Sequence, residues 1–472
     1  MRRISGYVFI CLLLSAGTVL AADKVVSRST ERKEVSVTVY NKSLALVREV
    51  RDIEMPKGEV VVEFEDVAQK IKPETVAIKA IDSGRLDVLE QNYEYDLLTP
   101  TRLMEKYEGR NLELIRENPK TGDERRIKAT LLSNHGGGVY RTQGGITFGD
   151  VGRPLLPDLP DNFVTHPTLR WMLHSAKAGK RRVEAAYLTT GMSWKADYVL
   201  VLDKKDRNAN LNGWVTLKND SGATFENANL ALVAGDVHQV QPEYSRRLYQ
   251  RKAQMNVVEK KGFQEEGLFE YHLYNLGRPT TVADKQQKQV SLLEASDVRV
   301  RRVLKVKTRY LQLEGTLRGG DPAKQKVEVF IEFANDKKSG LGMPIPAGVV
   351  RVYKADSRGG QQFLGEDRVD HTPRDEKVEI KVGNAFDLVA QRRQTDYKRV
   401  SKTVHQTEWE VKLRNHKKEA VKVEVIEPMN GDWEVLKSSH KGEREDAGTL
   451  RFILPVKPDG ETVLTYRVQT KI

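Results

Sequence analysis

The sequence has almost no cysteine. Cys11 is the only one in 472 residues, and it lies in an apolar stretch close to the N-terminus. If that stretch is removed, no thiol remains, which excludes disulfides, cysteine nucleophiles and thiolate metal sites. Stability must then come from buried apolar surface, and the chain is long enough for about three domains of roughly 150 residues each.

Long apolar runs are also absent after the first 21 residues. Arg2 and Arg3 precede a short apolar core at residues 7–14, and permissive residues follow up to Ala21. This order is typical of a secretory signal peptide, and we expect residues 1–21 to be cleaved, or one residue more. An uncleaved anchor is the other interpretation, but the run is shorter than the roughly 20 residues of a spanning helix. The sequence therefore predicts an exported periplasmic or extracellular protein, peripheral to the outer membrane if attached, with no transmembrane segment in the mature chain.

Motifs for catalysis and for cofactors are missing. Gly191-Met192-Ser193-Trp194 lacks the second glycine of a nucleophile elbow, and no His-Glu-x-x-His occurs. Gly340-x-Gly342 lacks the third glycine of a dinucleotide fingerprint, and the glycines after His135 join two expected strands instead of opening a helix. We predict no cofactor and no catalytic residue. Whether the protein is an enzyme stays open, because a triad can assemble from distant residues.

Charge does not point to one class of partner. The formal net charge is +12 and 31% of residues are charged, with both signs interleaved along the chain. An acidic partner such as anionic lipid or acidic glycan is one interpretation, and a solvated surface with a modest lysine excess is the favoured one. Nucleic acid is not expected as a partner of an exported protein.

Alternation with period two dominates the chain, and long helical periodicity is absent. The sequence predicts a mainly β class, with several antiparallel β-sandwich modules of Ig-like design and a small SH3-like β-barrel. The expected segments are a signal peptide (1–21), an N-terminal β-domain (33–92), the barrel (99–158), a central sandwich region (163–390) with a surface insertion (241–262), and a C-terminal Ig-like sandwich (391–472).

Local patterns refine this outline. Residues 23–32 are expected to be a disordered polar leader, and residues 34–62 to form two strands. Residues 99–107 are expected to form a short helix or a turn, with Pro100 at the first helical position. Residues 391–402 are expected to be a charged connector.

The stretch 328–379 is expected to hold a strand, a crossover marked by Pro344 and Pro346, and a returning hairpin, since proline removes backbone donors and does not fit a central strand. A faint repeat also runs through the chain, in which a strand ends in an asparagine followed by a turn. It occurs at Asn219, Asn335 and Asn415. Related sandwich modules predict such a repeat, and generic β-patterning explains it equally well.

A carboxylate-rich segment near residue 370 is the one weak metal candidate. Asp367, Asp370, His371 and Asp375 offer ligands for a hard cation such as calcium. Two arginines lie inside the segment and no glycine supplies the sharp turn, so salt-bridged strand ends are the favoured interpretation.

The insertion at 241–262 is the expected partner-contact surface, because it is basic, carries aromatic residues and lacks alternation. Its contact candidates are Tyr244, Arg246, Arg247, Tyr249, Arg251 and Lys252. A solvated loop without a partner is the alternative. The five tryptophans are expected to be core residues, although an exposed tryptophan can stack on a sugar ring.

Several longer sequence segments point to a family. They include SWKADYVLVL from Ser193, LNGWVTLKNDSG from Leu211, NLALVAGDV from Asn229, PIPAGVVRVYKAD from Pro344 and FLGEDRVDHTP from Phe363. The chain resembles a bacterial conserved-hypothetical family of unknown function that includes mucoidy-inhibitor-like proteins, here without their coiled-coil segment. The resemblance implies an exported, sandwich-rich protein with no assigned activity.

From these observations we predict a non-enzymatic binding or assembly module of the bacterial envelope that contacts another envelope protein or a polysaccharide. Sheet edges and the 241–262 insertion are the expected contact surfaces. A hydrolase with a site between β-modules is the competing prediction. A calcium-stabilised surface protein using Asp367, Asp370 and Asp375 is the third.

Overall fold

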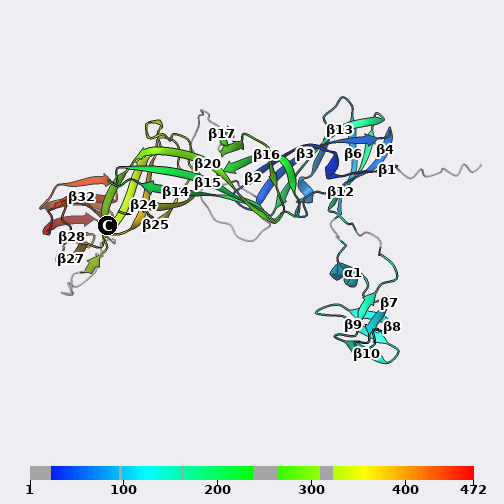
Figure 1. Ribbon diagram of the computed structural model, residues 1–472. Coiled ribbons are helices and arrows are strands. Elements are labelled where there is room, and N and C mark those ends of the chain that lie inside the picture. The colour runs from blue at the N-terminus through cyan, green and yellow to red at the C-terminus, as the bar shows by residue number, and fades with distance from the viewer. Residues whose placement is uncertain are drawn as a thin grey trace, which may run out of the picture. The chain divides into compact units, whose positions relative to one another are not determined.

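The computed structural model describes residues 23–94, 98–160, 164–235, 237, 263–268, 271–308 and 323–471. These residues are mainly β, with six sheets and one α-helix (Figure 1). They form two compact units. Unit 1 holds the described residues up to Ser36, Leu46–Thr190 and Ser221–Phe225, and unit 2 holds the remainder. No helix among the described residues combines the length and hydropathy needed to cross a bilayer.

The first sheet of unit 1 has four strands in the order β1-β4-β12-β6. They are β1 (Asp23–Ser27), β4 (Gly58–Phe64), β12 (Thr168–Ser175) and β6 (Leu86–Glu94). The prediction of a disordered leader is therefore wrong for residues 23–27. β1 runs parallel to β4 and pairs with it from Asp23 to Ser27, so backbone hydrogen bonds hold a segment whose side chains carry little apolar signal.

Unit 1 also contains the neighbouring strands β3, β13 and β5, with β2 next to β3 in the strand order. They are β2 (Arg32–Tyr40), β3 (Leu44–Met55), β13 (Gly179–Thr190) and β5 (Ala77–Ala80). Two strands were predicted between residues 34 and 62, and the structure has three, because β3 was missed. Glu49 and Arg51 occupy fully buried positions of β3, so charged residues break the apolar alternation.

These two charges are compensated inside the protein. The Arg51 guanidinium donates to a Glu49 carboxylate oxygen at 2.8 Å and lies 3.5 Å from the Phe64 ring centroid. The Tyr187 hydroxyl donates to the other Glu49 oxygen at 2.9 Å. Burial, followed by the nearby Glu49 charge, raises the pKa of Tyr187 well above its ordinary value, so the hydroxyl stays protonated as a donor. A buried charge paired in this way is tolerated where an isolated one is not.

A small domain is inserted between β6 and β12, which are paired strands of the first sheet. It contains α1 (Pro100–Lys106) and five strands in the order β10-β9-β8-β7-β11, namely β7 (Asn111–Glu117), β8 (Glu124–Ser133), β9 (Val139–Thr142), β10 (Gly145–Phe148) and β11 (Arg153–Leu155). The predicted helix is confirmed, with the Thr99 hydroxyl accepting from the Arg102 amide. The predicted barrel is not closed. Its described strands form an open sheet over a core of its own around Leu114, Leu131 and Tyr140.

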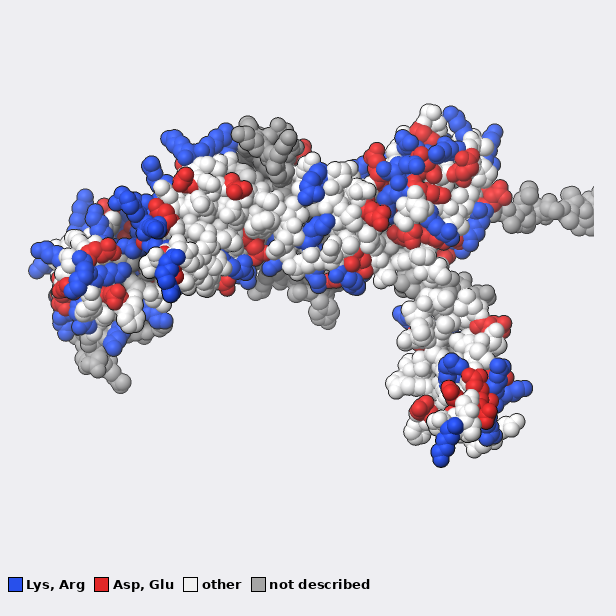
Figure 2. Space-filling view, viewed as in Figure 1, with Lys and Arg blue, Asp and Glu red and all other residues white. Residues whose placement is uncertain are grey.

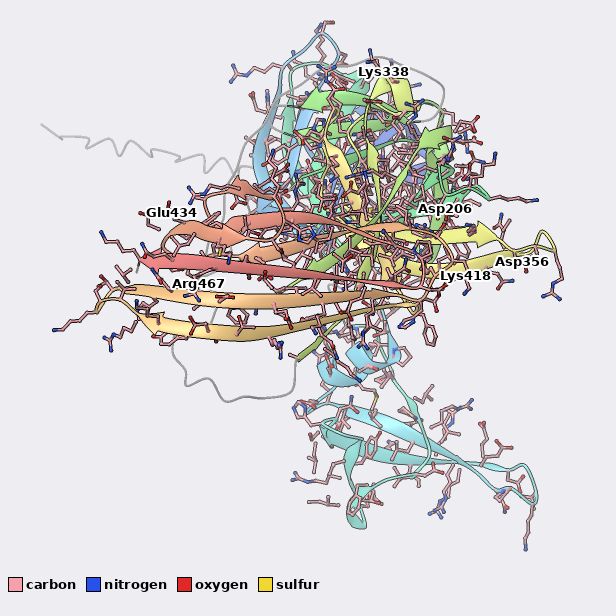
Figure 3. The ribbon with its side chains drawn as sticks, turned by 90° about the vertical axis from the view of Figure 1, so that its left-hand side faces the viewer. Asp206, Lys338, Asp356, Lys418, Glu434 and Arg467 are labelled. Carbon is pink, nitrogen blue, oxygen red and sulfur yellow. The ribbon has the colours of Figure 1, made fainter. Side chains whose placement is uncertain are left out.

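The first sheet of unit 2 has five strands in the order β20-β15-β14-β24-β25. They are β20 (Gln286–Arg299), β15 (Asn208–Asn219), β14 (Met192–Leu202), β24 (Gly348–Ala355) and β25 (Gln361–Val369). β14 and β24 are parallel, so the sheet is mixed. β24 and β25 form the predicted hairpin, with Asp356 at its tip (Figure 3). Four more strands belong to the same sheet as β2, namely β16 (Phe225–Ala234), β17 (Phe263–Leu268), β18 (Tyr271–Leu276) and β19 (Thr280–Val282).

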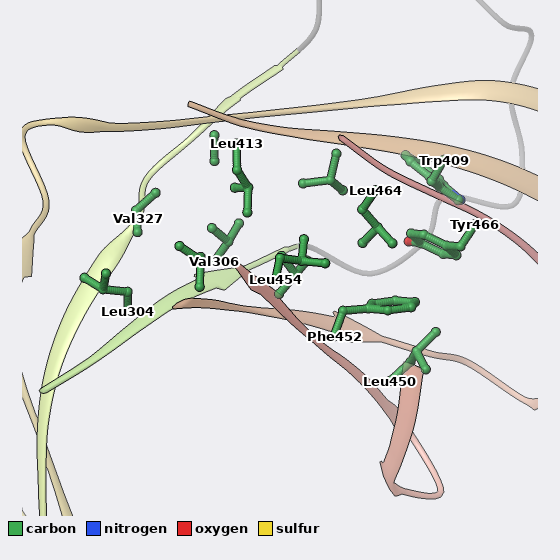
Figure 4. Packing of buried hydrophobic residues seen from close by; sticks show 14 of the residues in the cluster. Leu304, Val306, Val327, Trp409, Leu413, Leu450, Phe452, Leu454, Leu464 and Tyr466 are labelled. Carbon is green, nitrogen blue, oxygen red and sulfur yellow. The ribbon is translucent and has the colours of Figure 1, made fainter. Parts of the chain in front are cut away.

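The C-terminal part of unit 2 consists of two sheets around one core. The first is β26 (Lys377–Asn384)-β23 (Glu328–Ala334)-β21 (Arg301–Lys307)-β29 (Val421–Pro428)-β32 (Thr449–Val456)-β31 (Gly442–Asp446). The second is β22 (Ala323–Gln325)-β27 (Leu388–Arg399)-β28 (Val404–Asn415)-β33 (Gly460–Lys471)-β30 (Asp432–Ser438). Phe452 from one sheet meets Tyr466 from the other at 5.3 Å between ring centroids, and aliphatic side chains fill the remaining space (Figure 4).

The prediction of a charged connector at 391–402 is wrong for most of these residues, because β27 extends to Arg399 and pairs with β28. Arg392 on β27 is nearly buried, stacks on the Trp409 ring at 3.6 Å and donates to Glu427 at 2.9 Å. The high charge of this segment concealed a strand whose charged residue is paired inside the core.

The three asparagines of the repeat are all buried, and two of them share one role. Asn219, Asn335 and Asn415 are each at most 1% exposed, and the Asn219 side-chain amide donates to the Val282 carbonyl of β19. Asn335 reaches the carbonyl of Met343 at 2.8 Å, and Asn415 reaches that of Glu419 at 2.8 Å. Asn335 and Asn415 thus close the loops that follow their strands, and all three asparagines satisfy backbone carbonyls that would otherwise lack a partner.

Candidate functional site

An open groove of about 890 Å³ crosses the sheet of the small domain. Residues of β7, β8, β9 and β11 line it. Asn111 lies opposite Thr130, Glu113 opposite Lys128, and Thr130 opposite Arg141 in the strand register. Directly opposite residues share a face of a sheet, so these side chains form one continuous polar surface. The groove was not predicted from the sequence.

The charge of the groove is incompletely balanced. The Thr130 hydroxyl donates to Asn111 at 2.8 Å, and Glu113 lies 3.6 Å from Arg126. Within the described part of the chain, Lys128 and Arg141 form no ion pair. Lys128 and Arg141 outnumber Glu113 among the charged residues that line the groove, and this excess of positive charge favours an acidic ligand.

An exposed apolar strand continues this face. Ile146 on β10 lies opposite Arg141, and Phe148 lies opposite Val139. Their exposed fractions are 64% and 76%, which is high for large apolar side chains. β10 is the last strand in the sheet order, so no described strand covers its outer edge. A bare edge with exposed apolar side chains is the arrangement that binds an added strand.

The glycine loops singled out in the sequence are turns of the chain. Residues 134–138 join β8 to β9, and Gly136 and Gly137 adopt positive φ angles of 79° and 132° that suit glycine. Gly340 ends a short 3-10 turn in the left-handed conformation, and the Asp336 carboxylate accepts from the Ser339 amide there. Both loops therefore have conformational roles.

The candidate metal residues do not converge. Asp367 accepts from the amides of Arg368 and Lys381 at 2.9 and 2.7 Å, and His371 Nδ1 accepts from the Ala347 amide at 3.2 Å. Among the described residues, no three His, Cys, Asp or Glu side chains are grouped to hold a metal ion. The contact candidates of the 241–262 insertion (Tyr244, Arg246, Arg247, Tyr249, Arg251 and Lys252) lie outside the described residues.

One histidine–carboxylate pair deserves comparison with a catalytic triad. His166 Nδ1 lies 2.9 Å from Asp66 Oδ1, and the Ser29 hydroxyl donates to Asp66 Oδ2 at 2.8 Å. In a triad the histidine would join the serine to the carboxylate, whereas here both side chains bind the same carboxylate. Asp66 also accepts from the Ser29 amide and has a φ of 63°, so the cluster stabilises a turn.

Four of the five tryptophans are core residues, as predicted. Trp171, Trp194, Trp409 and Trp433 are at most 7% exposed. Trp214 differs, with 41% exposure on β15. Nothing in its sequence context distinguished it, because it continues an alternating strand as the others do.

Comparison with known families gives one match. The family model described as a domain of unknown function (DUF4139) matches residues 183–472, more than half of the chain. The match covers β14, β15 and both C-terminal sheets, and the small domain precedes it. No curated protein matches the chain.

Proposed function

The chain belongs to the DUF4139 family, and we propose that it is a non-enzymatic binding module of the bacterial envelope. Its small domain captures an extended acidic segment of another envelope protein. The groove beside the bare edge of β10 carries this proposal, because it combines a concave surface, unpaired cations and exposed apolar side chains on one face.

The mode of binding follows from the sheet. A partner segment adds alongside β10 and forms main-chain hydrogen bonds with its free edge. Its apolar side chains cover Ile146 and Phe148, and the part of the segment that continues into the groove places acidic side chains beside Lys128 and Arg141. Each contribution alone is weak, and together they define an extended ligand whose apolar and acidic contact residues share one face, at every second position.

Other elements of the proposal rest on the sequence. They are export directed by residues 1–21, a periplasmic or extracellular location, kinship with mucoidy-inhibitor-like proteins, and Ig-like modules in the C-terminal part.

The intermingled acidic and basic side chains on the visible surface support a protein-binding role over a polyanion-binding one, since no face of one sign dominates that view (Figure 2).

Charge reversal in the groove tests the proposal. In the full chain, Lys128→Glu with Arg141→Glu should reduce capture of the partner about tenfold or more, because repulsion replaces attraction. Lys120→Glu with Arg125→Glu is the matched control, since it changes net charge equally and neither residue lines the groove. Equal capture of the partner by both double variants would show that the groove is not the binding site.

A further inference from the structure

Trp214 stands apart from the other tryptophans in both exposure and surroundings. It lies in the five-stranded sheet of unit 2, where β15 pairs with β14 on one side and β20 on the other. Its neighbours along the strand, Gly213 and Val215, lie on the opposite, packed face, because side chains alternate across a strand. The indole therefore lies on the exposed face of a sheet whose other face is packed against the core.

Polar side chains surround the indole on that face. Trp214 lies opposite Asp197 on β14 and opposite Ser291 on β20. Two residues further along β15 on either side are Asn212 and Thr216. A flat aromatic ring is thus bordered by hydroxyl, amide and carboxylate groups.

The polar groups are fixed by one another before any ligand arrives. The Thr216 hydroxyl donates to Asp197 Oδ2 at 3.0 Å, and Arg351 donates to Asp197 Oδ1 at 3.1 Å. The Gln289 amide donates to Thr216 at 3.3 Å, and Arg351 also lies 3.2 Å from Glu366. These interactions link residues on all five strands of the sheet, so the array is held by the sheet and its rearrangement on binding is small.

The charges next to Trp214 neutralise one another. Lys195 lies 3.4 Å from Asp197, which also pairs with Arg351, and Lys218 pairs with Asp220. Burial alone would raise the pKa of Asp197, but Arg351, Thr216 and Lys195 lower it, so the carboxylate is ionised and matched by cations. The face offers hydrogen-bonding groups without an unpaired charge beside the indole. It is complementary to a neutral, hydroxyl-rich ligand and poorly suited to a polyanion.

We propose that the face around Trp214 binds a neutral pyranose chain. One sugar ring stacks on the indole through its C–H groups, because the aromatic face is apolar and rigid. Its hydroxyls exchange hydrogen bonds with Asn212 and Gln289, while Asp197 holds the surrounding polar groups in place. This site lies on a different domain from the groove and is independent of it.

Acrylamide quenching tests the site selectively. Trp214 is the only tryptophan of the five open to solvent, so the quencher reports on it and not on the buried four. The full chain is titrated separately with cellohexaose, maltohexaose and chitohexaose. We expect at least one to bind with a dissociation constant below about 5 mM and to protect the fluorescence from quenching.

Variants locate the binding. Trp214→Ala should weaken it about tenfold or more, and Trp214→Phe should retain most of it, because a phenyl ring still stacks. Phe386→Ala is the control, since this aromatic is 97% exposed and lies off the sheet. Three results would each overturn the proposal, namely no binding by any of the hexasaccharides, unchanged binding by Trp214→Ala, or displacement of the bound sugar by dextran sulfate at low concentration.

Discussion

The Tyr198 hydroxyl donates to the backbone carbonyl of Pro346 at 2.8 Å. Tyr198 is fully buried on β14, and burial, followed by the charge of Asp197, raises the pKa of its hydroxyl. Pro346 belongs to the proline-marked segment that leads from β23 in one sheet to β24 in another. The hydrogen bond therefore joins two of the segments on which the family resemblance rests, although they are about 150 residues apart in the sequence. It holds the crossover segment that brings β24 beside β14.

Tyr198→Phe tests this link. The substitution leaves a buried carbonyl without its donor, and we expect a loss of about 1–2 kcal/mol in the free energy of unfolding. Urea unfolding followed by near-UV circular dichroism measures it. Tyr353→Phe is the control, because the partly exposed Tyr353 ring packs on Phe363 and should cost less than about 0.5 kcal/mol. Equal losses would show that the hydrogen bond does not matter.

Glu332 should account for part of the fall in the free energy of unfolding at acidic pH. This carboxylate is 4% exposed, with Lys377 at 2.7 Å and Arg301 at 2.5 Å. Burial alone would raise its pKa, but Lys377, Arg301 and Lys305 lower the pKa to about 2. A depressed carboxyl pKa contributes stability above the unfolded value near 4.5, and that stability disappears as the pH falls towards about 2.

Glu332→Gln should therefore lower the free energy of unfolding at pH 7 by about 3 kcal/mol and flatten its fall between about pH 4.5 and 2. Denaturant unfolding across this pH range measures both effects. Glu376→Gln, at an exposed position in the turn before β26, should leave the acid limb unchanged. An unaltered acid limb in Glu332→Gln would contradict the account.

Removing one member of the Glu427–Arg392 pair should destabilise the protein strongly, whereas replacing both members with apolar residues should destabilise it little. Glu427 is fully buried and also accepts from the Thr308 hydroxyl at 2.5 Å. Glu427→Gln leaves the Arg392 charge uncompensated and should destabilise by about 3–5 kcal/mol, whereas Glu427→Leu with Arg392→Met should recover most of the loss. Thermal unfolding measures the series. The exposed pair of Lys418, which is labelled in Figure 3, and Asp459 provides the control, and Asp459→Asn should change stability by less than about 1 kcal/mol. A double variant as unstable as the single one would contradict the pairing argument.

The small domain should be removable. Glu94 and Thr168, which flank it, lie opposite each other in the β6–β12 ladder, and Leu98 donates to the Val164 carbonyl at 3.1 Å. Replacing residues 95–163 with a short Gly-Ser linker closes a natural hairpin and should leave the rest of unit 1 folded. All five tryptophans lie outside the deleted segment, so near-UV circular dichroism in the tryptophan region should be unchanged. Loss of that signal would show that the domain is needed for folding.

Sequence pattern predicted most strands because their inner faces alternate, as at Val60, Val62 and Phe64 in β4. It failed where charges lie inside. Glu49 and Arg51 concealed β3, and Arg392 concealed β27, since pairing within the core is a tertiary property with no periodic signal.

The candidate site was hidden for a related reason. The groove arises from the pairing of β7, β8, β9 and β11, and no one of these segments contains it. The sequence offers only a local signal, which is the apolar Ile146 and Phe148 in a very short strand between glycines, inside the segment predicted to form a barrel. The exposure of Trp214 could not be predicted either. Whether a residue of an alternating strand is exposed depends on which face of the sheet is buried.

Photocrosslinking from Ile146 in living cells tests the central claim most directly. A photoreactive amino acid replaces Ile146 in the full chain, and a second strain carries it at the exposed Phe386 as the control position. The account predicts a defined adduct from Ile146 only, mapped to an extended acidic segment of one envelope protein, and lost with Lys128→Glu and Arg141→Glu. The same adducts from both positions, or none from Ile146, would contradict a binding site at the edge of β10.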